Sequence, residues 1–186
     1  MTDTIIRCRK CNLYKTQIPF TDRNTKADIM LVGISSKIKK YEDEIPFDPR
    51  TRSGKLVDRM DATAQKYGWR IYRTNLVKCP PTGEDGKLRY PDEKEIADCF
   101  GHILKEIETV DPKLIFLLGN IVIKTVQRKW KLMPETDRRT SFLTYKYDGR
   151  IFAASRHPSY ILRSSQRTEN YLHDYEQLVI SVKERI

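Results

Sequence analysis

The sequence lacks the long apolar runs that would place it in a membrane. No run reaches the roughly 18 residues that a membrane-spanning helix requires, and residues 1–10 contain no apolar stretch resembling a secretory signal. Internal repeats, low-complexity segments and linker-like stretches are missing as well. These absences predict a cytoplasmic protein without membrane contacts, folded as one domain over residues 1–186. We expect this domain to be a monomer.

Cysteine is scarce, with only four among 186 residues, and the spacing of the four is uneven. Cys8 and Cys11 lie three positions apart in the charged stretch RCRKC, whereas Cys79 follows a strand-like run and Cys99 lies in a helix-like run. Disulfides are not expected in the cytoplasm, and the charges around the first pair argue against thiols that merely fill a core. One interpretation is that the fold gathers the thiols around an iron–sulfur cluster. The alternative is tetrahedral zinc, although zinc ligands usually come as two close pairs.

Acidic residues are outnumbered, with 25 Asp and Glu against 35 Lys and Arg, a formal net charge of +10. A basic protein suits a polyanionic partner, because Lys and Arg side chains that neutralise phosphates release counterions. A basic surface that serves only solubility is the alternative. We therefore expect nucleic acid as the partner.

Short aliphatic runs alternate with helical patterns along the chain. The aliphatic runs are bounded by charged residues, glycine or proline, as buried parallel strands are, and they cover residues 27–35, 70–78, 113–119 and 150–156. The helical patterns cover residues 54–67, 92–109, 120–130 and 169–186. This alternation predicts an α/β fold, a three-layer sandwich around a mainly parallel four-stranded central sheet. Residues 142–147, followed by Asp148-Gly149, predict a strand that turns back into the fourth run.

Three unusual segments stand at the carboxyl ends of predicted strands, where open α/β sheets bind ligands. They are Gly33-Ile34-Ser35-Ser36, the stretch TNLVKCPP that begins at Thr74, and the stretch RHPSYILR that begins at Arg156. Together with the N-terminal cysteines, these segments resemble the iron–sulfur uracil-DNA glycosylases, families 4 and 5 of that superfamily. The resemblance extends from Cys8 to Arg163 and rests on the combination of motifs, because each motif alone is weak.

The resemblance implies a cofactor and a DNA substrate. In the family, four cysteines hold a 4Fe–4S cluster that has a structural role and performs no base chemistry. The residues of this chain that match them are Cys8, Cys11, Cys79 and Cys99. The first two would form an N-terminal cluster-binding segment, and the other two would bind the cluster from the middle of the chain. The DNA partner would be single- or double-stranded.

The resemblance also implies a pocket for a base extruded from the helix. Phe47 matches the residue that stacks on this base, and Asn75 matches the amide that reads the pyrimidine edge. His157 matches the catalytic histidine, whose hydrogen bond to the base O2 would stabilise charge on the departing pyrimidine. Core packing for Phe47, a strand-end cap for Asn75 and a plain His-Pro turn are the structural alternatives.

The segment after His157 would contact the DNA backbone. Ser159 suits a phosphate contact, and the wedge that fills the gap left by the extruded base would consist of Tyr160, Leu162 and Arg163, with the arginine holding phosphate. The two remaining histidines, His102 and His173, lie in helical patterns and are interpreted as surface or helix-packing residues.

The chain departs from the family at the first motif. Family 4 enzymes carry a glutamate directly after the first glycine of G-E-x-P-G, whereas Gly33 is followed here by Ile34. Family 5 enzymes have an apolar residue at this place and excise a broader set of bases. Asp48 is the candidate for a replacement carboxylate, with Asp43 and Glu44 as alternatives, although loop acids are usually only solvated.

Two serines follow the substituted position. Ser35 and Ser36 are small and polar, so the pocket would have room for a larger group at the pyrimidine C5 atom. Gly33 and Ile34 complete the substrate-binding segment that the resemblance implies.

The sequence thus predicts a monofunctional DNA glycosylase that extrudes uracil or a C5-modified pyrimidine and hydrolyses its N-glycosidic bond, leaving an abasic site. No lysine stands out as a Schiff-base nucleophile, so no lyase step is expected. The alternatives are an anti-viral glycosylase specific for a bulky modified cytosine, a DNA-binding homologue that has lost catalysis, and a zinc-stapled accessory factor of replication.

Overall fold

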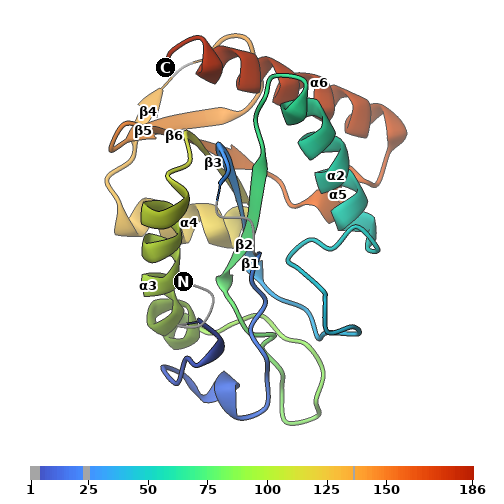
Figure 1. The fold of residues 1–186 in the computed structure, drawn as a ribbon, viewed down its shortest axis with the longest axis vertical. Helices are drawn as coiled ribbons and strands as arrows, with labels where there is room; N and C mark the ends of the chain where they lie inside the picture. The colour runs from blue at the N-terminus through green and yellow to red at the C-terminus, as the bar shows by residue number, and fades with distance from the viewer. Residues whose placement is uncertain (1–4, 23–25, 136) are drawn as a thin grey trace.

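A computed structural model describes residues 5–22, 26–135 and 137–186. Its central element is a sheet with the strand order β2-β1-β3-β6-β5-β4 (Figure 1). The first four strands in this order run parallel to one another, and the last two extend the sheet in antiparallel pairs. The strands are β1 (Ile29–Ser35), β2 (Ile71–Val77), β3 (Leu114–Leu118), β4 (Met133–Glu135), β5 (Leu143–Tyr147) and β6 (Arg150–Ser155).

Helices cover both faces of the sheet and produce three layers, as Figure 1 shows. One face packs against α2 (Arg52–Gln65) and α6 (Ser165–Lys183), and the other against α3 (Glu93–Val110) and α4 (Asn120–Lys129). The alternation of buried residues along β1 explains the two cores, because Ile29 and Leu31 enter the first while Met30 and Val32 enter the second. The remaining helices are the short η1 (Asn12–Lys15) and α5 (Pro158–Ile161).

Local signals set the helix ends. Asp92 and Glu95 form a reciprocal capping box at the start of α3, and Asp111 ends that helix in the left-handed conformation with a φ of 47°. Thr51 caps α2 through the Gly54 N–H. Gly54, predicted as the start of a helix, therefore lies inside α2 rather than at its end.

The predicted fold class is confirmed, with one correction to the sheet. The four predicted strands are present as β1, β2, β3 and β6, and the predicted hairpin is present as β5 and β6. In the described part of the chain the sheet has six strands rather than four, because β5 and β4 continue it. The sequence of β4, Met133-Pro134-Glu135, does not resemble a strand, but an edge strand tolerates proline because the missing N–H is needed on one side only.

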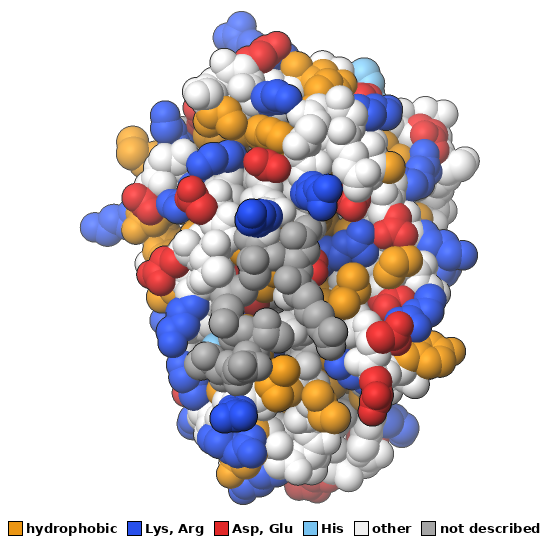
Figure 2. All heavy atoms as spheres, viewed as in Figure 1, with side chains coloured by type: hydrophobic (Ala, Val, Ile, Leu, Met, Phe, Trp, Pro, Cys, Tyr) orange, Lys and Arg blue, Asp and Glu red, His pale blue; other side chains and the backbone are white. Residues whose placement is uncertain are grey.

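The carboxyl ends of the parallel strands meet at the end of the molecule where the long loops gather (Figure 1). These loops are residues 36–51 after β1 and residues 78–92 after β2. No helix in the described residues is long and apolar enough to cross a membrane. On the face in Figure 2, Lys and Arg side chains alternate with acidic and hydrophobic ones, so the net charge does not form one continuous basic surface there.

Candidate active site and cysteine pocket

The ends of the parallel strands surround a cavity of about 200 Å³. Phe47, Asn75 and His157 all line this cavity, although they lie on three separate segments of the chain. The Phe47 and His157 ring centroids are 6.4 Å apart, with an angle of 39° between the ring planes. The structure therefore brings the three predicted base-pocket residues together around one space. The predicted neighbours Ile34, Ser35, Ser36 and Asp48 line the same cavity.

Phe47 is held in an unusual backbone conformation. Its φ of 52° lies in the left-handed region, where a bulky side chain is strained. Two contacts hold the turn, since the Arg73 guanidinium donates to the Phe47 carbonyl at 3.1 Å and Gly54 of α2 leaves room for the adjoining backbone. A Cβ atom at Gly54 would lie 1.8 Å from the Asp48 carbonyl oxygen. Such imposed strain is typical of a functional position.

Gly33 allows the Asn75 and Phe47 side chains to approach β1. It is paired with Asn75 in the parallel register, and a Cβ atom at Gly33 would lie 2.4 Å from Asn75 Oδ1 and 2.7 Å from Phe47 Cζ. Neither neighbour has an easy way to move, because Asn75 is buried and Phe47 sits in a constrained turn. A side chain at this position would therefore displace the residues that line the cavity.

We expect the Gly33→Ala variant to lose about 100-fold in kcat/KM for base excision, because a displacement of about 1 Å in a positioned group has a cost of that order. Steady-state abasic-site formation measures this loss. Gly101→Ala is the matched control, since its new Cβ would meet only the Lys10 Nζ atom, at 3.4 Å. Equal rates for Gly33→Ala and the unmodified protein would contradict the assigned role.

Asn75 is fixed from two sides. Its side-chain Nδ2 donates to the Ser36 hydroxyl at 3.3 Å, and its backbone carbonyl accepts from the Lys78 ammonium at 2.7 Å. Both Asn75 and Ser36 are buried. Ser36 therefore positions the amide, in addition to the size and polarity that the sequence indicates.

Lys78 belongs to a buried ionic network behind the cavity. Its ammonium is 2.6 Å from the Glu106 carboxylate, and both side chains are almost fully buried. Glu106 also accepts hydrogen bonds from the Tyr72 hydroxyl at 2.9 Å and the Thr74 hydroxyl at 2.9 Å. Every charged group in this network has partners, as a buried ion pair requires. The network joins β2, which carries Asn75, to α3.

His157 follows β6 and caps the short helix α5. The Ser159 N–H donates to His157 Nδ1 at 3.2 Å, and the Ser159 hydroxyl lies 2.9 Å from the same atom. Because Nδ1 accepts a backbone hydrogen bond, the neutral ring carries its proton on Nε2. Burial lowers the pKa of His157, which favours this neutral form. Ser159, predicted to contact phosphate, is thus placed to orient the histidine.

The three carboxylates of the loop after β1 each form an ion pair with a nearby Lys or Arg side chain. Asp48 is 2% exposed, accepts a 2.6 Å bond from the Arg50 guanidinium, and has its pKa lowered by this interaction to about 2. Asp43 is exposed and pairs with the same arginine at 3.1 Å. Glu44 is buried and accepts a 2.6 Å bond from the Lys37 ammonium. Asp48 is the one of these acids that lines the cavity, where it supplies a fixed negative charge.

The predicted DNA-contacting segment forms a cluster of cations around Tyr160. The guanidiniums of Arg156, Arg163 and Arg167 lie 4.4, 5.3 and 4.5 Å from its ring centroid. Concentrated arginines on an aromatic ring suit the binding of phosphate. Leu162, predicted as part of a wedge, is partly buried and packs against the core between the sheet, α2 and α6.

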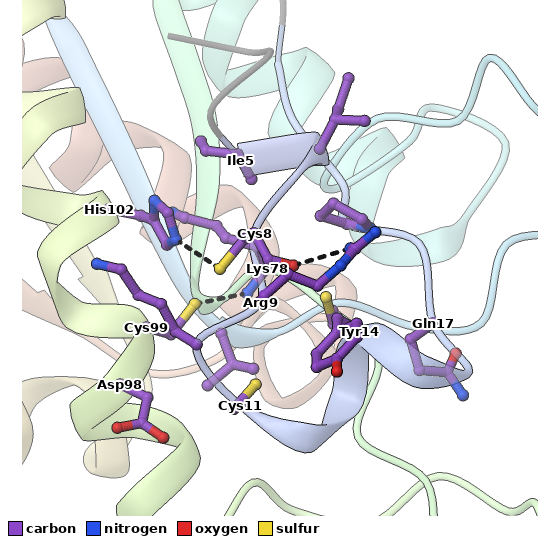
Figure 3. Close-up of a pocket in the computed structure, with 15 residues that line it drawn as sticks. Ile5, Cys8, Arg9, Cys11, Tyr14, Gln17, Lys78, Asp98, Cys99 and His102 are labelled. Atoms are coloured by element: carbon purple, nitrogen blue, oxygen red, sulfur yellow. Dashed lines mark hydrogen bonds between the residues drawn. The ribbon is translucent and has the colours of Figure 1, made fainter.

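A second pocket contains the four cysteines. Cys8 and Cys11 come from the N-terminal segment and Cys99 lies on α3 (Figure 3), while Cys79 lies two residues after the end of β2. The tertiary structure therefore brings together thiols that are up to 91 positions apart in the sequence. The apolar side chains of Leu13, Val77 and Ile96 pack around this group.

The buried cysteine thiols in this pocket would be deprotonated only when a cation is bound beside them. Burial raises the pKa of Cys79 to about 12 and that of Cys99 to about 11, so the bare thiols are neutral. Iron supplies the positive charge that stabilises thiolates. The Lys78 N–H already donates to Cys99 Sγ at 3.4 Å. In the described residues, no three His, Cys, Asp or Glu side chains are grouped so as to hold a metal ion.

Two features of the cysteine pocket were not expected from the sequence. His102, interpreted as a surface or helix-packing residue, is 3% exposed, and its Nε2 lies 3.2 Å from Cys8 Sγ (Figure 3). His102 lies three residues after Cys99 on α3, and residues i and i+3 share a helix face. This spacing could have predicted that His102 lies near the cysteines. Lys78 links this pocket to the base cavity through its backbone and side chain, which no local pattern indicates.

The comparison with known proteins agrees with the motifs. The family model described as the uracil DNA glycosylase superfamily matches residues 20–179. The chain is similar to the type-4 uracil-DNA glycosylase of Archaeoglobus fulgidus, with 27% identity over 94% of this chain and 87% of the relative. The enzymes of Saccharolobus solfataricus and Sulfurisphaera tokodaii share 29% and 30% identity over 73% and 68% of this chain.

The matches differ in how much of each relative they include. The chain spans 62% of the length of the Saccharolobus enzyme and 56% of the Sulfurisphaera enzyme. The family match itself covers most of the chain and includes every residue of the base cavity. The chain therefore belongs to the uracil DNA glycosylase superfamily and is a DNA N-glycosylase.

Proposed function

We propose that this chain is a monofunctional glycosylase that excises uracil, or a pyrimidine modified at C5, from DNA. The observation that carries the proposal is the convergence of Phe47, Asn75 and His157 on one cavity of about 200 Å³. The extruded pyrimidine stacks on Phe47, and the Asn75 amide reads its edge through the O4 and N3–H groups. The named activity of the relatives supports uracil as the substrate.

In this proposal the neutral His157 donates its Nε2 proton in a hydrogen bond to the base O2 atom. The glycosidic bond breaks with its electrons moving to the pyrimidine, and the donor stabilises the resulting anion. Water adds to the sugar cation that is left, and the proton that it loses goes to the departing pyrimidine anion through solvent. Asp48 is placed to stabilise this cation by its charge, because its low pKa makes it a weak proton acceptor.

The proposal is tested with single- and double-stranded oligonucleotides that carry one uracil. We expect abasic sites that become strand breaks only after alkali treatment, since Lys37, which lines the cavity, is paired with Glu44 at 2.6 Å rather than free as a Schiff-base nucleophile. The same assay is run on hypoxanthine, hydroxymethyluracil and glucosylated hydroxymethylcytosine. Absence of product from all four bases would remove the proposal. Tight binding to uracil-containing DNA without product, unchanged in a His157→Ala variant, would favour a homologue that has lost catalysis.

A second candidate substrate is a bulky modified cytosine, which would fit an anti-viral role. Ile34, Ser35 and Ser36 line both the base cavity and an adjoining space of about 320 Å³. A sugar attached at C5 could extend into this space and contact the two hydroxyls. The ratio of excision rates on glucosylated hydroxymethylcytosine and on uracil decides between the two candidates, because only the larger substrate uses the adjoining space.

For the cofactor, we propose that Cys8, Cys11, Cys79 and Cys99 hold a 4Fe–4S cluster. Their common pocket and apolar surroundings support this assignment. When bound, the cluster supplies a covalent crosslink between the N-terminal segment, the end of β2 and α3. It takes no part in the base chemistry.

We expect Cys99→Ser to lose the visible absorbance of protein purified without oxygen, together with its iron and acid-labile sulfide. The variant should also melt at a lower temperature, because a crosslink between three segments is lost. Equal amounts of iron and sulfide in the unmodified protein support the cluster. Zinc without sulfide would contradict it and favour a structural zinc site.

A further inference from the structure

A groove beside the base cavity has the dimensions of a second nucleotide site. Its volume is about 420 Å³, and its walls include Ile34 and His157, which also line the base cavity. The two spaces therefore border on each other at this pair of side chains. A DNA strand whose pyrimidine occupies the base cavity would have its neighbouring nucleotide at the groove.

An open aromatic ring, that of Tyr90, lines the groove and also borders the adjoining space of about 320 Å³. Tyr90 is 73% exposed, and within the described residues its ring has no stacking or hydrogen-bonding partner. Its backbone is nevertheless fixed, because the Tyr90 carbonyl accepts a 3.0 Å bond from Arg89, which is itself held by Glu95 at 2.6 Å. The Arg89 N–H also donates to the Pro81 carbonyl at 3.0 Å. The backbone that carries the Tyr90 ring is thus already ordered, which lowers the cost of stacking a base on the ring.

The groove is also lined by Arg156 and Tyr160, which have the chemistry of a phosphate site. Arg156 is exposed and lies 4.4 Å from the centroid of the Tyr160 ring, which Arg167 also covers. Tyr160 is therefore occupied by cations, whereas Tyr90 is free to stack. Ile121, which is 40% exposed, lines the same groove and adds apolar surface. An open ring, an apolar side chain and a cation together match the base, sugar and phosphate of one nucleotide.

We propose that this groove binds the nucleotide next to the extruded pyrimidine, with its base stacked on Tyr90 and its phosphate near Arg156. This inference rests on the proposed function, because it assumes that the pyrimidine occupies the neighbouring cavity. The subsite adds a preference for single-stranded over double-stranded DNA. In a duplex the neighbouring base is paired and stacked, so the groove is filled only in single-stranded or locally melted DNA.

The test combines a protein variant with a change in the DNA. The probe is a single-stranded oligonucleotide with one 2′-fluorinated deoxyuridine, which resists cleavage, and its dissociation constant is measured by fluorescence anisotropy. In two further probes, the nucleotide on one side or the other of the uracil is replaced by an abasic spacer. We expect Tyr90→Ala to weaken binding of the complete probe about 5- to 100-fold.

The spacer probes isolate the stacking contact. With the spacer on the side that enters the groove, the unmodified protein should lose affinity by a similar factor, and Tyr90→Ala should cause almost no further loss. With the spacer on the other side, the full effect of Tyr90→Ala should remain. Tyr90→Phe is the matched control and should bind like the unmodified protein, because it keeps the ring.

The test distinguishes failure of the nucleotide subsite from failure of the proposed function. If Tyr90→Ala weakens all three probes equally, or none of them, the nucleotide subsite is wrong, whatever base the enzyme excises. If the unmodified protein binds the uracil probe no better than a thymine probe and forms no abasic sites, the proposed function is wrong. An effect of Tyr90→Ala that appears only with C5-glucosylated substrates would also overturn the subsite, because the ring would then contact the substituent.

Discussion

Replacing His157 with alanine should lower kcat for uracil excision by about 100- to 1,000-fold, the loss typical when one donor to a developing anion is removed. The structure gives a specific reason, since the Ser159 N–H occupies Nδ1 and leaves the Nε2 proton for the base. Burial lowers the pKa of His157, so the neutral donor is the form present at physiological pH. Single-turnover abasic-site formation measures the chemical step directly.

His173→Ala is the matched control for this prediction, because His173 is exposed on α6, away from the residues of the base cavity. Binding of the His157→Ala variant to the 2′-fluorinated probe should change little, since the interaction forms mainly as charge develops on the leaving base. A variant that keeps the full kcat, or that loses activity only by weaker binding, would show that His157 is not the donor.

Replacing Glu106 with glutamine should lower the free energy of unfolding by about 3–5 kcal/mol, because it leaves the Lys78 ammonium buried without a countercharge. The substitution preserves the shape of the side chain, so the loss reports on charge rather than on a cavity. Urea unfolding at a fixed cofactor content provides the measurement.

Two variants sharpen this second prediction. Glu169→Gln removes one partner of the exposed Arg59–Glu169 pair and should change stability by less than about 1 kcal/mol. The double variant Lys78→Met with Glu106→Leu replaces both buried charges and should be more stable than Glu106→Gln alone. If the double variant is less stable than the single one, the cost of the single variant does not come from an unpaired charge.

The sheet could be predicted because its parallel strands are short, continuous apolar runs. Residues 114–118, for example, are all buried and contain only Leu, Ile and Phe, which no amphipathic helix would combine. The edge of the sheet could not be predicted in the same way. Met133 and Pro134 of β4 are exposed, so their pairing with β5 depends on a neighbour and leaves no periodic pattern.

Helix ends followed from local chemistry only where the caps are simple. The acidic start of α3 after Pro91 marks a capping box, and the predicted boundary agrees with the structure to within one residue. The apolar periodicity predicts a start for α6 that is four residues too late, because Ser164 caps the helix through the Arg167 N–H in a polar stretch without that periodicity.

The base-pocket residues differ in how much the sequence alone could show. Asn75 and His157 could be predicted to line one cavity because each belongs to a motif at a strand end, a place that topology assigns to ligands. The strained turn at Phe47 was not visible, since a positive φ is imposed by Arg73 and Gly54, which lie elsewhere in the sequence. The pairing of Asp48 with Arg50 was equally hidden, and it changes the role that this carboxylate can have.

The sequence by itself determined the chemistry available to this protein: four thiols, an amide and a histidine at the ends of buried strands, and an excess of positive charge. Such properties belong to single residues and to their near neighbours. Only the tertiary structure decided which of these groups meet. Lys78 joins the thiols to the base cavity, and Tyr90 faces the groove beside it, because packing between distant segments sets contacts that no spacing along the chain records.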